Sequence, residues 1–173
     1  MLEQAVQQGA GLAVLPENFA FIGAIDKDSL ALREKQGDGP LQAFLSRIAA
    51  RLGIWIVGGT LPLESDDRSK SRAACLVFNS EGQNVARYDK QHLFDVHLPE
   101  SNEHFNESHT IEPGNQVCVI NTPFGKLGLA VCYDLRFPEL FRAMIDKGAE
   151  IITLPAAFTT VTGQAHWEVL LRT

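Results

Sequence analysis

Three short segments of the chain each place a reactive side chain at the end of a strand-like run. Glu17 ends the segment LPE, Lys90 ends the segment YDK, and Cys132 ends the segment GLAVC. A thiol attacks an acyl carbon as the thiolate, so it requires a proton acceptor and nearby positive charge. The three side chains therefore supply a base, a cation and a sulfur nucleophile, which together suit cysteine-dependent acyl transfer.

The composition predicts one α/β domain over residues 1–173 that acts on a small molecule. The hydrophobic share of 45% and the charged share of 21% are ordinary for a globular protein with a sizeable core. The formal net charge of -6, without a cluster of lysine and arginine, argues against a nucleic-acid partner.

The cysteines indicate a reducing compartment, for which the cytoplasm is the expected location. Cys75, Cys118 and Cys132 include no CxxC pair, and their odd number does not suit a disulfide framework. Cys75 and Cys118 lie within predicted strands and are expected in the core. The apolar runs are shorter than the roughly 20 residues that a membrane span needs, and the N-terminus lacks the charge pattern of a signal peptide.

The predicted helices and strands alternate in the first half of the chain. Glu17 and Lys90 each lie at the end of a predicted strand. Pro16 stops one predicted strand just before Glu17, and Lys90 ends the second strand of a hairpin. The predicted elements are a helix over 2–9, a strand over 11–15, a helix over 40–52, a strand over 54–58, and a hairpin formed by 73–79 and 84–89.

The second half predicts a polar loop followed by a βαβ unit. The segment 91–115 has little periodicity and is interpreted as an active-site loop, because connections this long are usually functional. Its histidines at 92, 97, 104 and 109 lack a zinc-like spacing, so they are interpreted as solvated and no metal is expected. The following elements are strands over 116–121 and 126–131, a helix from Pro138 to Gly148, a strand over 150–154, and a helix over 165–173.

Four segments together resemble the nitrilase superfamily of carbon-nitrogen hydrolases. They are LPENF, YDKQHLFDV, GLAVCYDLRFPELFR and LPAAFTTVTGQAHWEVLLR, in the order that the family shows. The last one is similar to the branch of deaminated-glutathione amidases and ω-amidases. The chain departs from the family pattern at Asp89, where arginine is common, and it resembles a fragment truncated at both ends, since members usually run longer.

The resemblance implies an αββα sandwich that assembles as a homodimer in the full-length form. It also implies that Glu17 is the general base, Lys90 stabilises the oxyanion, Cys132 is the nucleophile, and Glu107 is a second glutamate of the site. By the same resemblance, Phe158 and Thr162 line the substrate pocket. No cofactor is implied.

Two more residues are expected to contact the substrate. The backbone N–H of Tyr133 would donate to the oxyanion beside the Lys90 ammonium. The Arg136 guanidinium suits a substrate carboxylate, since its planar fork can donate two hydrogen bonds to that group. Alternatively, Arg136 forms a structural salt bridge with Asp134 or Glu139.

The sequence thus predicts hydrolysis of a small carboxylate-bearing amide through a thioester, with release of ammonia, as for deaminated glutathione or α-ketoglutaramate. An N-carbamoyl-amide or nitrile hydrolase would use the same three side chains. A different class of function, a catalytically silent fragment or assembly module, is the second hypothesis. In that case Glu17 only solvates a strand end, and Lys90 protects a hairpin edge.

Overall fold

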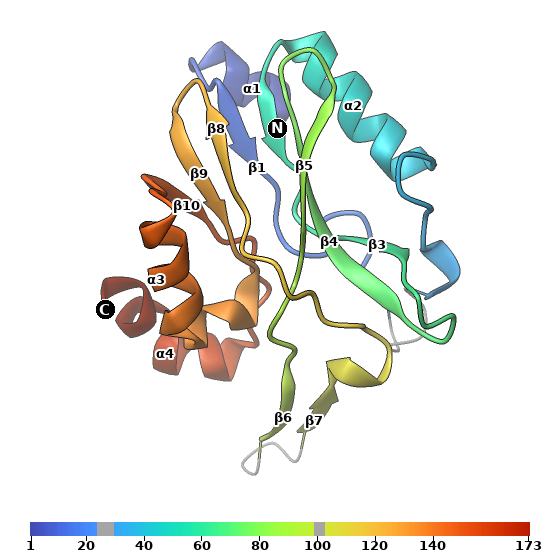
Figure 1. Cartoon of the computed structure of the whole chain (residues 1–173), viewed down its shortest axis with the longest axis vertical. Helices are drawn as coiled ribbons and strands as arrows, with labels where there is room; N and C mark the ends of the chain where they lie inside the picture. Colours follow the sequence, from blue (N-terminus) through green and yellow to red (C-terminus); the bar gives the residue numbers. More distant parts are fainter. Residues whose placement is uncertain (24–29, 99–102) are drawn as a thin grey trace.

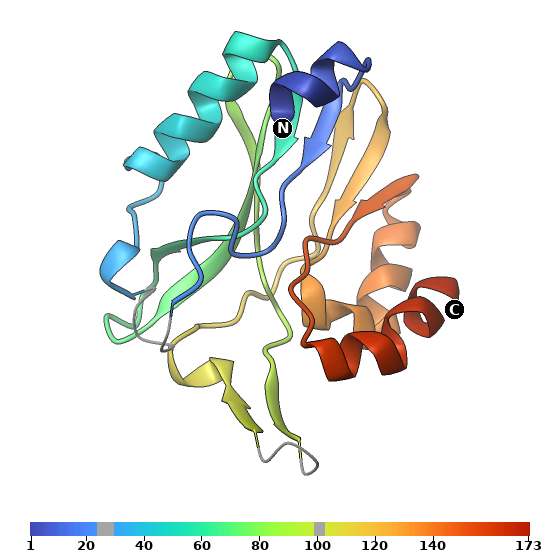
Figure 2. The ribbon, with the colours of Figure 1, turned by 180° about the vertical axis from the view of Figure 1, so that it is seen from behind.

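Two β-sheets pack face to face and helices cover their outer faces (Figures 1 and 2). The computed structural model describes residues 1–23, 30–98 and 103–173. The layers follow the order helix, sheet, sheet, helix, as the resemblance to the nitrilase superfamily implied.

The first sheet has five strands. Its order is β1-β2-β4-β3, and β5 also pairs with β4. Only β1 and β2 run parallel, and the other pairs are antiparallel. The strands are β1 (Leu12–Val14), β2 (Trp55–Val57), β3 (Leu61–Glu64), β4 (Ser71–Phe78) and β5 (Asn84–Asp89).

Helices α1 (Leu2–Gln7) and α2 (Pro40–Leu52) cover the outer face of this sheet. Leu45 of α2 packs in one cluster with Leu76 of β4, whereas the next residue, Val77, belongs to the cluster between the sheets. Strand β4 is buried on both faces because successive side chains point to opposite sides of a sheet. Proline opens α2 and a left-handed glycine follows its end, as predicted.

The second sheet has the order β10-β9-β8, from β8 (Val119–Thr122), β9 (Gly125–Leu129) and β10 (Ile151–Thr153). Strands β9 and β10 run parallel, and helix α3 (Pro138–Asp146) connects them, which confirms the βαβ prediction. Met144 of α3 is fully buried in the cluster that also contains Leu127 and Leu129 of β9 and Tyr88 of β5. This shared core joins the two sheets.

The prediction of an irregular loop over 91–115 is wrong for much of that segment. Strands β6 (Asp95–Leu98) and β7 (Glu103–Asn106) pair antiparallel, and a 3-10 turn, η2 (Glu107–His109), follows them. The hairpin projects from one end of the sheets (Figure 1). The strand β6 has only four residues and its described side chains are exposed or half-buried, so the alternation of Val96 and Leu98 with polar residues is a short signal in the sequence. Residues 99–102 of the predicted loop lie outside the described residues.

Two further elements differ from the sequence prediction. Strand β3 was not predicted, and it contains Pro62, a residue that argues against a strand. Helix α4 (Thr160–Arg172) begins earlier than the predicted start at 165, because the Thr159 hydroxyl caps it by accepting from the Thr162 N–H.

Candidate active site

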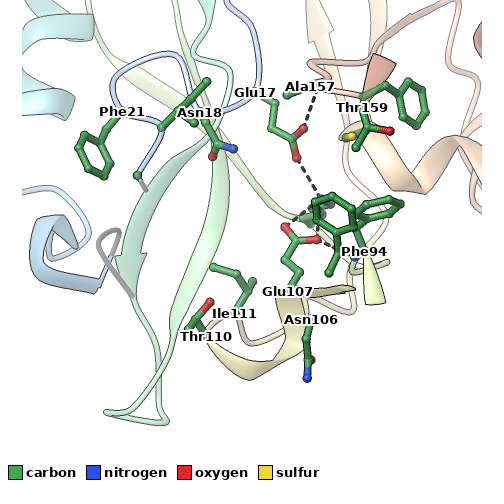
Figure 3. A pocket seen from close by; sticks show the side chains of 16 residues that line it. Glu17, Asn18, Phe21, Phe94, Asn106, Glu107, Thr110, Ile111, Ala157 and Thr159 are labelled. Atoms are coloured by element: carbon green, nitrogen blue, oxygen red, sulfur yellow. Dashed lines mark hydrogen bonds and ion pairs between the residues drawn. The ribbon is translucent and has the colours of Figure 1, made fainter. Parts of the chain in front are cut away.

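Side chains from four distant segments meet at one end of the sheets (Figure 3). The Lys90 Nζ lies 2.9 Å from Glu17 Oε1 and 2.8 Å from Glu107 Oε2. Cys132 lines the same cavity as these three side chains. The structure therefore brings together the four residues predicted to be catalytic.

The backbone around Glu17 is held in place by its neighbours. Asn18 has a left-handed backbone, with φ at 54°, and its N–H donates to Thr60 Oγ1 at 2.8 Å. Gly59 runs so close to the Pro16 carbonyl that a Cβ at that position would clash with it. From the other side of the site, the Ala157 N–H donates to Glu17 Oε2 at 2.8 Å. The carboxylate is thus oriented before any substrate binds.

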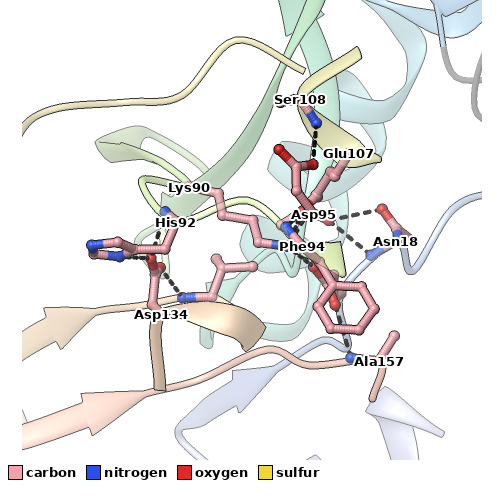
Figure 4. Close-up of polar contacts among 12 residues, drawn as sticks. Asn18, Lys90, His92, Phe94, Asp95, Glu107, Ser108, Asp134 and Ala157 are labelled. Carbon is pink, nitrogen blue, oxygen red and sulfur yellow. Dashed lines mark hydrogen bonds and ion pairs between the residues drawn. The ribbon is translucent and has the colours of Figure 1, made fainter. Parts of the chain in front are cut away.

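Lys90 is a buried cation between two carboxylates (Figure 4). It directly follows β5, and its N–H donates to the Ala73 carbonyl at 3.0 Å. Burial alone would lower the pKa of Lys90, but the charges of Glu17 and Glu107 outweigh burial and raise it. The side chain is consequently an ammonium at neutral pH.

Glu107 holds the lysine from the opposite side to Glu17. Both of its oxygens accept from Lys90 Nζ, and Oε2 also accepts from the Phe94 N–H at 2.7 Å. Burial raises the pKa of Glu107, although the Lys90 charge acts in the opposite direction. The hairpin between Phe94 and Glu107 thus closes on the cation, so the segment predicted as an active-site loop does contribute to the site.

Cys132 begins the 3-10 turn η3 (Cys132–Arg136). Ala130 and Val131 connect this turn to the end of β9. Its φ of 48° is left-handed, and its N–H donates to the Pro155 carbonyl at 2.9 Å. Burial, reinforced by the Glu17 charge, raises the pKa of the thiol to about 12, while the Lys90 charge lowers it by less. The Cys132 side chain is therefore a thiol at neutral pH.

Left-handed backbone outside glycine occurs, among the described residues, only at Asn18 and Cys132. One position directly follows Glu17, the predicted base, and the other is Cys132, the predicted nucleophile. Such conformations are costly for residues with a side chain, and they persist where the surroundings impose them. The fold therefore places its non-glycine left-handed residues at the site where the reacting groups must be aimed.

A cavity of about 290 Å³ opens beside these groups. Its aromatic wall consists of Phe21, Phe94, Phe105 and Phe158, and its neutral polar side chains are Asn18, Asn106, Thr110 and Thr159. Among these residues, only Phe158 was predicted from the sequence to line the substrate pocket. Asn18 and Phe94 do lie within the resembling segments LPENF and YDKQHLFDV, which was the signal available for them.

Of the predicted substrate-binding residues, only Phe158 lines the cavity. Thr162 is buried at the start of α4, where its N–H and hydroxyl bond to Thr159. The Tyr133 ring packs edge-on against Phe94 and Phe137.

Arg136 lies behind the cavity wall. Its guanidinium carbon is 5.9 Å from the centre of the Phe158 ring, and its Nη2 is 3.2 Å from His166 Nδ1. It forms no salt bridge with Asp134 or Glu139, contrary to the structural alternative, because the Asp134 oxygens already accept from other donors.

The histidines do not gather around a common point. His97 and His104 stack across β6 and β7 with ring centroids 4.0 Å apart, whereas His92 contacts Asp134. In the described part of the chain, no group of three or more His, Cys, Asp and Glu side chains is arranged to hold a metal ion.

The Asp89 that departs from the family pattern is paired with a neighbour on the same strand. Its two oxygens accept from Arg87 Nε at 2.8 Å and from Arg87 Nη2 at 3.0 Å. Its negative charge is thereby compensated without Lys90.

Comparisons with known proteins identify the family of the chain. The family model described as carbon-nitrogen hydrolase matches residues 1–173. A deaminated glutathione amidase of Yersinia enterocolitica is 45% identical over 99% of this chain and 61% of its own length. The human deaminated glutathione amidase is 42% identical, and the match covers 53% of it. An omega-amidase of Xenopus laevis is 36% identical, with 60% covered. The chain thus spans just over half to three fifths of these relatives.

Solved structures agree with this placement. Yeast Nit3, of branch 10 of the nitrilase superfamily, superposes with a TM-score of 0.84 at 34% identity, over 99% of this chain and 60% of Nit3. An amidase from Nesterenkonia superposes with a TM-score of 0.77 at 28% identity, over 97% of this chain and 61% of the amidase; that variant has a glutamate replaced by glutamine and carries acrylamide added to its active-site cysteine. The αββα sandwich is confirmed, and the chain belongs to the carbon-nitrogen hydrolase family of the nitrilase superfamily.

Proposed function

We propose that this chain carries the catalytic site of a cysteine amidase that hydrolyses a small carboxylate-bearing amide and releases ammonia. The observation that carries the proposal is the Glu17 carboxylate, which contacts the Cys132 thiol and the Lys90 ammonium beside an open cavity. Relatives named deaminated glutathione amidase and omega-amidase support this reaction class.

Acylation begins with transfer of the thiol proton from Cys132 to Glu17 as the sulfur attacks the amide carbonyl carbon. The thiol requires this base because its pKa, raised to about 12, leaves little thiolate at neutral pH. Negative charge then develops on the carbonyl oxygen next to the Lys90 ammonium and the Tyr133 N–H. Collapse of the tetrahedral intermediate breaks the C–N bond, and Glu17 returns the proton to the leaving nitrogen, which departs as ammonia.

Deacylation uses the same carboxylate. Glu17 takes a proton from a water molecule, whose oxygen attacks the thioester carbon, and the Cys132 sulfur leaves and regains a proton. Glu107 keeps Lys90 in place throughout, since both of its oxygens are bound to Nζ. The net reaction converts an amide and water to a carboxylic acid and ammonia.

Recognition of the substrate's carboxylate is assigned to Arg136, at the outer side of Phe158. The guanidinium lies against the rings of Tyr133 and Phe158, at 5.6 and 5.9 Å from their centres. A substrate chain that passes the Phe158 ring would bring its carboxylate to this cation. Arg136→Ala should therefore raise KM for α-ketoglutaramate while leaving KM for a short neutral amide unchanged, and equal effects on both would remove this assignment.

The proposal is tested by ammonia release from deaminated glutathione, α-ketoglutaramate, an N-carbamoyl amino acid and a nitrile. We expect release from the first two with the wild-type chain and none with Cys132→Ala. Preference for the N-carbamoyl compound or the nitrile would assign the same three side chains to a different substrate. A wild-type chain that is folded by circular dichroism and yet matches Cys132→Ala with every compound would support the catalytically silent alternative.

We further infer that subunits pair in solution, as proposed for the full-length form. Large apolar side chains stay exposed on neighbouring helices, namely Ile145 of α3 and Val161, Val169 and Leu171 of α4. Light scattering after size exclusion tests this pairing.

The three cysteines are free, which supports a reducing compartment such as the cytoplasm. No helix of the described residues is long and apolar enough to cross a membrane.

A further inference from the structure

We infer that Asp134 is a positioning residue, which sets the distance between nucleophile and cation by binding the chain on both sides of Lys90 and the turn that carries Cys132. The inference rests on the proposed amidase function for its catalytic consequence. Its structural part concerns four hydrogen bonds to one buried carboxylate, and it goes beyond the four residues that contact the reacting atoms.

Asp134 has no exposed surface, and each of its oxygens accepts two hydrogen bonds. Figure 4 shows those that join it to His92. Oδ2 accepts from the Tyr88 hydroxyl at 2.7 Å and from the Val131 N–H at 2.8 Å. Oδ1 accepts from the His92 N–H at 3.0 Å and contacts His92 Nδ1 at 2.7 Å. Since a carboxylate only accepts, Nδ1 carries a proton. Asp134 therefore has a hydrogen-bond partner in four places, two on each oxygen.

The donors lie on two segments, the one that carries Lys90 and the one that carries Cys132. Tyr88 and His92 flank Lys90 at equal spacing, two residues before it and two residues after it. Val131 precedes Cys132, so its N–H is bound by a residue inside the same 3-10 turn. One side chain thereby ties the segment of the cation to the segment of the sulfur, at both ends of the former.

The turn needs such support because Cys132 holds a left-handed backbone that is unfavourable for a residue with a side chain. The Phe137 ring adds a second contact at the other end of the turn, where it stacks on the His92 ring at 3.7 Å between centroids and 11° between planes. The His92 side chain is thus held by a hydrogen bond and by a stack, and substitution can separate the two.

The decisive experiment compares two variants of His92. His92→Asn keeps a donor at the position of Nδ1 but loses the stack, whereas His92→Phe keeps the stack but loses the donor. If the hydrogen bond to Asp134 positions the site, His92→Phe lowers kcat by about 10²-fold with KM unchanged, as expected when reacting groups shift by about 1 Å. His92→Asn should retain most of the wild-type kcat. Tyr88→Phe, which also removes one of the four hydrogen bonds to Asp134, should lower kcat in the same direction as His92→Phe.

A second measurement does not depend on amide turnover. In the wild type, burial and the Glu17 charge raise the pKa of Cys132 and keep it as a thiol. A displacement of the sulfur toward water would lower this pKa and make the sulfur more accessible to alkylation. At pH 8, iodoacetamide should therefore label Cys132 faster in His92→Phe than in the wild type, and at the wild-type rate in His92→Asn. Peptide mapping distinguishes Cys132 from Cys75 and Cys118.

Glu34→Gln is the matched control, since it alters another buried carboxylate that accepts backbone hydrogen bonds outside the cavity. It should lower the melting temperature without accelerating labelling of Cys132, which separates positioning from general loss of stability. Equal kcat losses in the two His92 variants, or a larger loss in His92→Asn, would overturn the inference. A wild type that hydrolyses no amide would defeat the proposed function alone, because the labelling comparison would still decide the role of Asp134.

Discussion

Glu17 and Glu34 are buried to a similar degree, but their side chains contact different partners. Glu17 is 7% exposed and Glu34 is 6% exposed. Glu34 accepts from the N–H groups of Leu41 and Gln42 at 2.5 and 3.2 Å, and from the Gln42 side chain at 3.0 Å, so all three donors are neutral. They lie in the first turn of α2, where backbone N–H groups lack helical partners. Glu34 thus caps a helix from a distance.

Glu17 has a different set of contacts. It accepts one backbone N–H, but its other partners are the Lys90 ammonium and the Cys132 thiol, and it lines a cavity that can admit a substrate. The thiol proton is the mobile one among these groups. Burial alone therefore does not identify a catalytic carboxylate; a partner that can exchange a proton, next to space for a substrate, does.

The largest effect should come from exchanging each carboxylate for an amide. Glu17→Gln removes the general base and should lower kcat by about 10³-fold, within the range that such catalysis contributes. Glu34→Gln should leave kcat unchanged in the same ammonia-release assay. If the two substitutions slowed turnover equally, the distinction between a catalytic and a capping glutamate would fail.

Removing the cation should have the next largest effect. Lys90→Met deletes the oxyanion partner and should lower kcat by about 10²–10³-fold. It also leaves Glu17 and Glu107 buried without a compensating charge, so the pKa of Glu107, already raised by burial, should rise further. A raised carboxyl pKa favours the folded state as pH falls, because the folded protein then takes up protons more readily than the unfolded chain. Thermal unfolding should consequently show a smaller deficit against wild type at pH 5 than at pH 8, and a deficit independent of pH would contradict this account.

The rate at which Cys132 is alkylated should also distinguish Glu17 from Glu34. The pKa of Cys132 is raised to about 12, so its alkylation by iodoacetamide should become faster as the pH rises. Below the pKa, each increase of one pH unit raises the thiolate fraction tenfold, so the rate should rise by about 100-fold from pH 7 to pH 9. Glu17→Gln removes a charge that raises this pKa, so alkylation at pH 8 should accelerate even as hydrolysis stops. Glu34→Gln should not change the profile. A rate that is already constant above pH 7 would show a preformed thiolate instead.

The smallest effect concerns the stability of the capped helix. In Glu34→Gln, an amide NH2 must face a backbone N–H of α2, so the free energy of unfolding should fall by about 1–3 kcal/mol. Urea titration followed by circular dichroism measures this change. Glu17→Gln should cost at least as much, because it removes one of the two negative charges that compensate the buried Lys90 ammonium, and a smaller loss there would contradict this account.

Local patterns in the sequence predicted the elements with strong end signals. Pro40 and Gly53 bound α2 as expected, and the βαβ unit around Cys132 is present. The patterns missed strand β3, with its proline, and the hairpin of β6 and β7, whose described side chains are largely exposed. Leu61 and Leu63 of β3 and Val96 and Leu98 of β6 do alternate with other residues, but each strand has only four residues and β3 contains a proline, so the sequence signal is short.

The sequence by itself determined which side chains could react, because base, cation and thiol are read from residue type and from motifs that end strands. Only the tertiary structure decided their protonation and their supports. The Glu17 contact to Lys90 spans 73 residues and its contact to Ala157 spans 140. The pKa of Cys132 and the four donors around Asp134 depend on burial and on partners at such separations, and these arise only when the two sheets pack together.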